Sequence, residues 1–355
     1  MRITYSFLIV FLAIFITSCN NTGGSTNATK PAPTKIEPAA DENNQGIIPT
    51  AVTHNTATLP TSSEQVPTKI LLTSTISATV QLEVTDTPLI QIQIPQDSAP
   101  KPKRKLTPNA WKRLPIIPPV SDSVALIYKR GLELGNNPNA YSKIGDCGST
   151  PTWFMGDFDK GPRYYDLGEY QDLDAVIQEF GGSHGRTSLA ARSGFNAPSL
   201  FVSLWSNPEL CEPNESPLEC EFRVHRPIVA FIMLGANDMW HADEFEPSMR
   251  AIIEFSIENG VIPIISTKAD NLEGDGSIND TIARLAIEYD IPLLNYWRAV
   301  QNLPDKGLQE DGVHLTWSRN FFNDPNAMRR AWPVRNLTAL QTLDVVWRKA
   351  TGQNQ

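Results

Sequence analysis

Seven consecutive apolar residues, Ile228 to Leu234, lie between Pro227 and Gly235. The run lacks the polar and apolar alternation of a half-exposed strand, which is typical of a strand covered on both faces, as in the middle of a parallel sheet. A buried helix is the competing interpretation, but the run is short for one. Asn237 and Asp238 follow directly, where open parallel sheets place their binding crevice. The pattern therefore predicts functional chemistry near Asn237.

Apolar spacing predicts alternating helices and strands on both sides of this run. The predicted helices cover 121–134, 173–180, 245–259, 278–289 and 337–350, and the further strands cover 141–144, 261–265 and 291–294, with 199–204 as strand or loop. Strands that alternate with helices of this length form βαβ units, so we predict an α/β fold with a parallel sheet covered by helices. Right-handed crossovers bring the carboxyl ends of the strands to one edge, where catalytic residues are expected.

The first nineteen residues have the pattern of an export signal. Arg2 precedes an almost wholly apolar run over 7–16, which is too short for a stable membrane span, and small residues follow. Residues 16–19 also resemble the bacterial lipobox, which implies cleavage before Cys19 and attachment of lipid to its thiol. The alternative is an ordinary secretory signal. In both cases we expect an extracytoplasmic protein, and the lipobox adds a lipid anchor to the bacterial membrane.

Composition divides the rest of the chain into two parts. Residues 20–119 are rich in Thr, Pro, Ser, Asn and Ala, which predicts a disordered tether, although 70–84 and 88–95 alternate enough for an edge strand or two. Residues 120–355 are numerous enough for one well-buried domain. The formal net charge of −9 argues against nucleic acid as a partner.

The chain has four cysteines, of which Cys19 is assigned to the anchor. Cys211 and Cys220 flank a polar loop, and in an oxidising compartment we predict a disulfide between them. Cys147 is then left alone. No group of histidines and cysteines has zinc spacing, so the sequence predicts no metal and no cofactor.

Three polar segments follow predicted strands and should gather at the same edge of the sheet. Gly145-Asp146-Cys147 follows the first strand, 235–238 follows the central one, and Asp311 with His314 lies in the loop after the last. A carboxylate three residues before a histidine can orient one ring nitrogen while the other faces a nucleophile. Each segment is weak evidence alone, and their order and placement carry the weight.

At these residues the chain resembles the SGNH, or Gly-Asp-Ser-Leu, hydrolases, over about residues 143–315. The resemblance implies a three-layer α/β/α fold with a flavodoxin-like parallel sheet and an acyl esterase acting on small-molecule or glycan esters. It assigns the nucleophile position to Cys147, the oxyanion hole to Gly194 and Asn237, and the remaining catalytic roles to His314 and Asp311.

The chain departs from that family because cysteine occupies the serine position. A thiol at the start of a helix and within reach of an imidazole has its thiolate favoured, so Cys147 is chemically competent. Ser149, two residues later, is an alternative nucleophile. A third interpretation is a non-catalytic lipoprotein that binds a ligand or glycan. Our leading hypothesis is a surface-tethered esterase with a Cys147, His314 and Asp311 triad.

Overall fold

A computed structural model of the chain describes residues 106–353. The predicted signal peptide 1–19 with Cys19, the segments 70–84 and 88–95, and the predicted tether up to residue 105 lie outside the described residues. Within 106–353, no helix is long and apolar enough to cross a lipid bilayer.

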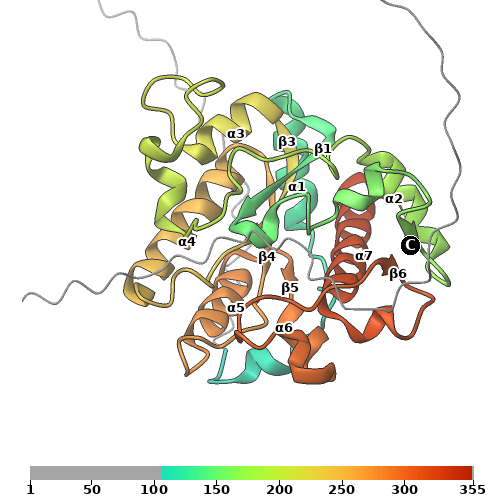
Figure 1. Ribbon diagram of the computed structural model, residues 1–355. Helices are drawn as coiled ribbons and strands as arrows, with labels where there is room; N and C mark the ends of the chain where they lie inside the picture. The colour runs from blue at the N-terminus through green and yellow to red at the C-terminus, as the bar shows by residue number, and fades with distance from the viewer. Residues whose placement is uncertain (1–105, 354–355) are drawn as a thin grey trace, which may run out of the picture. The chain divides into compact units, whose positions relative to one another are not determined.

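The core of the fold is a parallel sheet (Figure 1). Its strands, in spatial order, are β1 (Asn137–Gly145), β3 (Pro227–Met233), β4 (Ile262–Ser266) and β5 (Leu293–Leu294). An isolated parallel bridge joins Gly145 to Ala191 on the side of β1 away from β3. Counting this short segment as the second strand in sequence gives the order 2-1-3-4-5, which is that of flavodoxin-like sheets.

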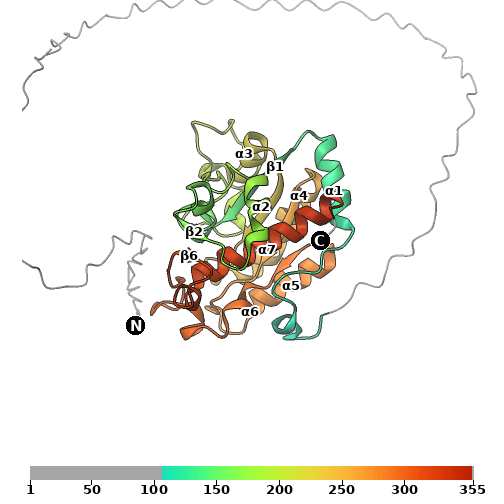
Figure 2. The ribbon, with the colours of Figure 1, turned by 90° about the vertical axis from the view of Figure 1, so that its right-hand side faces the viewer.

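Helices cover both faces of the sheet (Figures 1 and 2). One face carries α1 (Ser123–Glu133), α2 (Asp174–Glu179) and α7 (Ala331–Thr351), and the other carries α3 (Pro217–His225), α4 (Ala242–Glu258) and α5 (Ser277–Tyr289). The second group lies together because β1, β3, β4 and β5 advance in one direction, and right-handed crossovers then use one face. The α/β fold with a parallel sheet between helical layers is as predicted.

The central run forms β3, and every residue of this strand is buried, as expected for a strand with helices on both sides. α4 shows why the flanking helices pack there. Its buried residues Phe245, Met249, Ile252 and Ile253 recur at helical spacing and make one apolar face.

Some elements differ from the sequence prediction. α7 begins at Ala331 rather than 337, and 199–204 forms two short 3-10 turns, η5 (Pro198–Phe201) and η6 (Ser203–Trp205). The sequence did not predict α3, the short helix α6 (Tyr296–Val300), or a second parallel sheet of β2 (Tyr165–Asp166) and β6 (Asn320–Phe321). Two-residue strands and single-turn helices have too little apolar periodicity to be recognised.

The packed domain begins before residue 120, the boundary that composition predicts. Trp111 is buried and packs edge-on against Trp297, with ring centroids 4.8 Å apart. The Asn295 side chain donates hydrogen bonds to the carbonyl oxygens of Trp111 (2.9 Å) and Leu114 (3.1 Å). Trp111 and the distant Asn295 hold this segment against the domain. A single tryptophan does not change the average composition of the segment, so composition could not indicate this boundary.

Candidate active site

The candidate nucleophile lies on a tight turn at the carboxyl end of β1. At Gly145, φ is +152°, and a Cβ there would lie 2.3 Å from the carbonyl oxygen of Met233. Only glycine fits such a position, so the strand can end in this sharp turn. Asp146 then accepts a hydrogen bond from the Gly148 amide (2.8 Å) and begins η2 (Cys147–Ser149).

Cys147 and Ser149 occupy different environments on this turn. The Cys147 side chain is half-buried, whereas Ser149 is fully buried and its Oγ has no hydrogen-bond partner among the described residues. Ser149 Oγ also lies only 2.3 Å from where a Cβ on Gly145 would be, facing into the fold. The thiol is therefore the group on this turn that can reach a substrate. The predicted helix start is only a three-residue 3-10 turn, so a helix dipole adds little there.

Asp311 and His314 form a local pair. Asp311 Oδ2 lies 2.5 Å from His314 Nδ1, while Oδ1 accepts hydrogen bonds from the amides of Val313 and His314, both at 2.9 Å. Burial raises the pKa of Asp311, but the hydrogen bonds from His314 and the two amides outweigh it and hold the pKa below its ordinary value. The carboxylate therefore fixes the ring with Nδ1 toward Asp311 and Nε2 away from it.

Electrostatic contacts connect the candidate residues across the edge of the sheet. Burial raises the pKa of Asp146, and the positive charges of Arg335 and His314 both counteract that rise. His314 thus lies near the turn that carries Cys147, although 167 positions separate the two residues in the sequence.

The two predicted oxyanion-hole loops are linked to each other and to β1. The Asn237 side-chain amide donates to the carbonyl oxygen of Phe195 (2.9 Å), and Asp238 Oδ1 accepts from the Ala197 amide (2.8 Å). The Arg192 amide donates to the carbonyl oxygen of Gly145 (3.1 Å). Gly194 and Asn237 are both exposed residues, and these bonds connect their loops to each other and to the end of β1.

Asp238 connects the two loops that carry Asn237 and Gly194. It is buried, and burial raises its pKa to about 6 although the amides of Ala197 and Gly235 donate to it. One oxygen, Oδ2, has no hydrogen-bond partner among the described residues. The hydrogen bond from the Ala197 amide to Asp238 Oδ1 joins the loop after β3 to the loop that carries Gly194, and so helps to hold that loop in place.

Two charged residues at the site were not predicted. Lys268 follows β4, lies beside Gly235, and is paired with Asp270 and, at 2.6 Å, with Glu273. Its position directly after an apolar strand was a usable signal. Arg335 comes from α7 and lies next to the Cys147 turn. Its helix is far from every motif in the sequence, so no local pattern indicates it.

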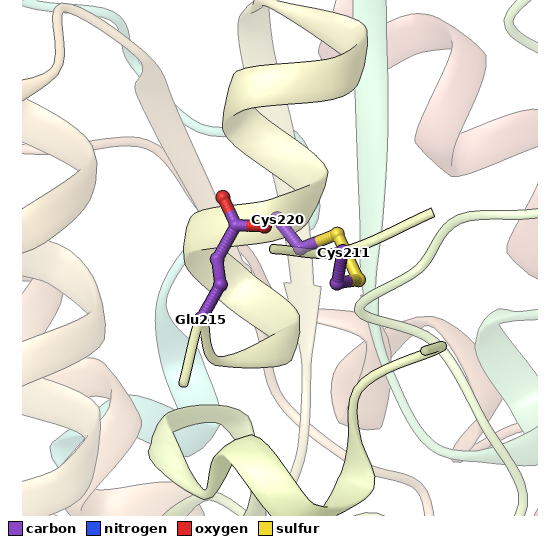
Figure 3. A group of neighbouring side chains, drawn as sticks. All are labelled: Cys211, Glu215 and Cys220. Carbon is purple, nitrogen blue, oxygen red and sulfur yellow. A yellow bond between two sulfur atoms is a disulfide. The ribbon is translucent and has the colours of Figure 1, made fainter. Parts of the chain in front are cut away.

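Cys211 and Cys220 are joined in a disulfide (Figure 3). Cys220 lies on α3 and not in a loop, as the sequence analysis assumed. With Glu215, these cysteines form the one grouping in 106–353 that is compact enough to hold a metal ion. Both sulfur atoms are used in the disulfide, and the Glu215 carboxylate pairs with Arg223 (2.7 Å), so the group does not have the donors of a metal site.

Neither the family models nor the curated proteins compared with this sequence give a match. The structure is similar to solved esterases and lipases. A GDSL-like lipase from Bacteroides thetaiotaomicron is 14% identical, with 62% of this chain and 98% of that chain covered and a TM-score of 0.38. For the esterase EstA from a Pseudoalteromonas species these values are 12%, 58%, 97% and 0.38. For an acetylxylan esterase from Geobacillus stearothermophilus they are 16%, 57%, 93% and 0.36. Similarity at this level assigns no residue its role, and the fold class rests on the strand order given above.

Proposed function

We propose that this protein is an SGNH-type acyl esterase in which Cys147 is the nucleophile. One observation carries the proposal. The half-buried thiol of Cys147 lies at the carboxyl end of β1, and the imidazole of His314, oriented by Asp311, lies near the same turn. A nucleophile, a base and a carboxylate that orients the base make up the arrangement of a hydrolytic triad.

The reaction proceeds in two halves. With its proton held by His314, the Cys147 thiolate attacks the acyl carbon of the ester, and the carbonyl electrons move to oxygen to give a tetrahedral oxyanion. Collapse of this intermediate expels the alcohol, which takes a proton from His314, and leaves a thioester on Cys147. His314 then removes a proton from water as the water attacks the thioester. A carboxylic acid leaves and the thiol is restored.

Three donors would stabilise the oxyanion. They are the backbone amides of Cys147 and Gly194 and the side-chain amide of Asn237, which has a second N–H besides the one given to Phe195. Such donors contribute about 3 kcal/mol each in hydrolases where one has been removed. Asp311 contributes by keeping the His314 ring in one orientation through both halves of the reaction.

Exposed aromatic side chains beside the site suit an ester carried on a sugar. Trp240 follows the loop of Asn237 and is 79% exposed, and Trp317 follows His314 and is 59% exposed. Flat indole rings provide apolar contact area for the faces of sugar rings. We therefore propose small-molecule or glycan esters as substrates.

The test is turnover on a panel of acetyl and longer-chain esters, including acetylated sugars. Cys147→Ala should abolish hydrolysis, whereas Ser149→Ala should retain most of it because Ser149 is buried. Cys147→Ser should retain part of the activity, since the base and oxyanion hole suit acyl transfer by either nucleophile. Loss in Ser149→Ala with retention in Cys147→Ala would transfer the role to Ser149. If neither wild type nor Cys147→Ser hydrolyses any ester of the panel, a non-catalytic binding lipoprotein is favoured instead.

We further propose that the protein is exported and anchored to the membrane through lipid on Cys19. The support is the signal-like pattern and the lipobox resemblance of residues 16–19. Cys19→Ala should abolish incorporation of labelled fatty acid and block lipoprotein processing. Lipid labelling that persists in this variant would rule out the anchor.

A further inference from the structure

Arg335 is held in one position by three aromatic rings. Its guanidinium carbon lies 5.3 Å from the ring centroid of Phe154, 5.5 Å from that of Tyr296 and 5.1 Å from that of Trp332. The rings come from the segment after η2, from α6 and from α7 itself. Cation–π contacts of this kind fix a guanidinium without neutralising its charge.

The guanidinium lies directly beside the Cys147 turn. A Cβ built on Gly148 would be 3.1 Å from Arg335 Nη1, so the absence of a side chain on Gly148 leaves room for the charge. Nη2 lies 2.9 Å from Met233 Sδ, and Met233 pairs with Gly145 in the sheet. The positive charge therefore lies at the adjacent ends of β1 and β3, where the turn begins.

The Arg335 guanidinium does not satisfy all of its hydrogen-bond donors within residues 106–353. Arg335 Nε is buried and has no hydrogen-bond partner among the described residues. Burial lowers the pKa of Arg335, while Tyr296, Asp146 and Cys147 raise it. An arginine stays protonated across the physiological range even so. A cation with little water around it interacts strongly with any nearby group that can become negative.

We propose that Arg335 is the positioning residue that keeps the Cys147 thiol ionised. The three-residue turn η2 is too short to supply a helix dipole, and the charge of an imidazole changes near neutral pH. Arg335 keeps its charge throughout. The inference rests on the proposed function only in taking Cys147 as the nucleophile.

Other charged groups face the same turn. Asp146 precedes Cys147, and a carboxylate there disfavours a neighbouring thiolate. His314 approaches Asp146 from the opposite loop, and Asp270 acts on it from the segment after β4. Tyr296 faces the guanidinium and is neutral at ordinary pH, since burial raises its pKa. Arg335 is thus the fixed positive charge among these groups, while the charge of His314 depends on pH.

The test is the rate of iodoacetamide alkylation of Cys147 as a function of pH in the full-length protein. Digestion with trypsin gives a peptide over 144–160 in which Cys147 is the single cysteine, and its mass reports alkylation at this site. Arg335→Met should raise the midpoint of the rate profile by about one pH unit, which lowers the rate below the midpoint about tenfold. Arg335→Lys, which keeps the charge, should recover most of the shift.

Arg348→Met is the matched control. Arg348 is also on α7 and lies over a tryptophan, Trp347, at 5.4 Å, but it pairs with Asp344 and is about 20 Å further along the helix. Its profile should equal that of wild type. Arg335→Met in a His314→Ala background should still shift the midpoint, which separates the guanidinium from the imidazole.

An unchanged midpoint in folded Arg335→Met would overturn the proposal. So would a wild-type midpoint equal to that of the protein in urea, near the ordinary thiol value of about 8.5. Arg335→Gln provides a second neutral variant if methionine prevents folding. The alkylation result is independent of ester turnover, so a shifted midpoint with no esterase activity would retain this inference and remove the proposed function.

Discussion

The side-chain amide of Asn237 donates a hydrogen bond to the backbone carbonyl of Phe195, with a nitrogen–oxygen distance of 2.9 Å. Phe195 follows Gly194, so this bond joins the loop after β3 to the loop that holds the other candidate oxyanion donor. One N–H of the amide is used in this way, and the second remains available to a substrate oxygen. The same side chain therefore links the two loops and, in the proposed mechanism, gives its second N–H to the oxyanion.

Asn237→Ala should lower kcat about 10²- to 10³-fold, because it removes a donor that acts on the charge of the transition state. KM should change little, since the ground-state ester has little charge on its carbonyl oxygen. Steady-state kinetics on the best ester of the panel measures both. Asn259→Ala is the control, because Asn259 makes a similar bond to the carbonyl of Phe255 (2.8 Å) at the end of α4. An effect confined to KM would contradict the oxyanion role.

The sheet and its major helices could be predicted because each has a repeating apolar pattern. β3 is a continuous apolar run, and α4 has apolar residues at a helical period. A parallel sheet then places the residues after its strands at one edge, so topology predicts that Cys147, Asn237 and His314 lie near that edge.

α3 was missed although the sequence contains its start signal. Ser216 and Glu219 form a capping box with Pro217 at the first helical position, but the helix is short and the interval was interpreted as a loop between cysteines. Arg335 could not be predicted at all. Its place beside Cys147 depends on how α7 packs over the sheet, and no spacing in one sequence encodes that long-range contact.

Asp311→Asn should lower kcat about 10²- to 10⁴-fold, because an amide can hold His314 in the wrong tautomer. The lower part of this range is expected, since the side chains of His314 and Asp311 are 41% and 47% exposed and water screens their interaction. The kinetics should be compared with Asp324→Asn, whose carboxylate makes a similar turn with the Asn326 amide (2.8 Å) away from the candidate site residues. Equal activity of Asp311→Asn and wild type would exclude Asp311 from the triad.

A second group of buried charged residues lies on and beside β1. Lys143 is buried and donates to the carbonyl of His184 (2.7 Å). Its neighbour Ser142 contacts Glu221, which also forms a two-point ion pair with Arg186, at 2.5 and 2.9 Å. Burial lowers the pKa of Lys143 from 10.5 to about 7, although the negative charges of Asp159 and Glu221 oppose this. The domain therefore carries a lysine that is costly to charge.

The stability difference between Lys143→Met and wild type should depend on pH. The unfolded chain keeps the lysine proton up to about pH 10.5 and the folded domain only up to about pH 7, so wild-type stability from this group rises across that interval. Below pH 7 Lys143 is protonated in the folded domain, and burial of its positive charge destabilises the fold by the full amount. At pH 6 Lys143→Met should have a higher free energy of unfolding than wild type. Between pH 6 and pH 9.5 this difference should decrease by a few kcal/mol, as expected for a pKa shift of this size. Urea unfolding measures this difference.

Lys160→Met is the control for this measurement. Lys160 pairs with Asp157 on the surface and its side chain is 48% exposed, so Lys160→Met replaces a lysine without removing a buried charge. A stability difference for Lys143→Met that does not change between pH 6 and pH 9.5 would show that Lys143 keeps an ordinary affinity for its proton in the folded domain.

The disulfide between Cys211 and Cys220 should stabilise the domain by about 2 to 3 kcal/mol at most, because it closes a short loop in the unfolded chain. Cys211→Ser with Cys220→Ala should lower the free energy of unfolding by this amount, the alanine being chosen because Cys220 is fully buried on α3. Reduction of wild type should give a similar loss, whereas Cys147→Ala should leave the response to reductant unchanged. Mass mapping of the unreduced protein decides the pairing directly. A peptide linking Cys147 to Cys211 or Cys220 would remove both the disulfide assignment and the proposed nucleophile, since a thiol held in a disulfide cannot attack an ester.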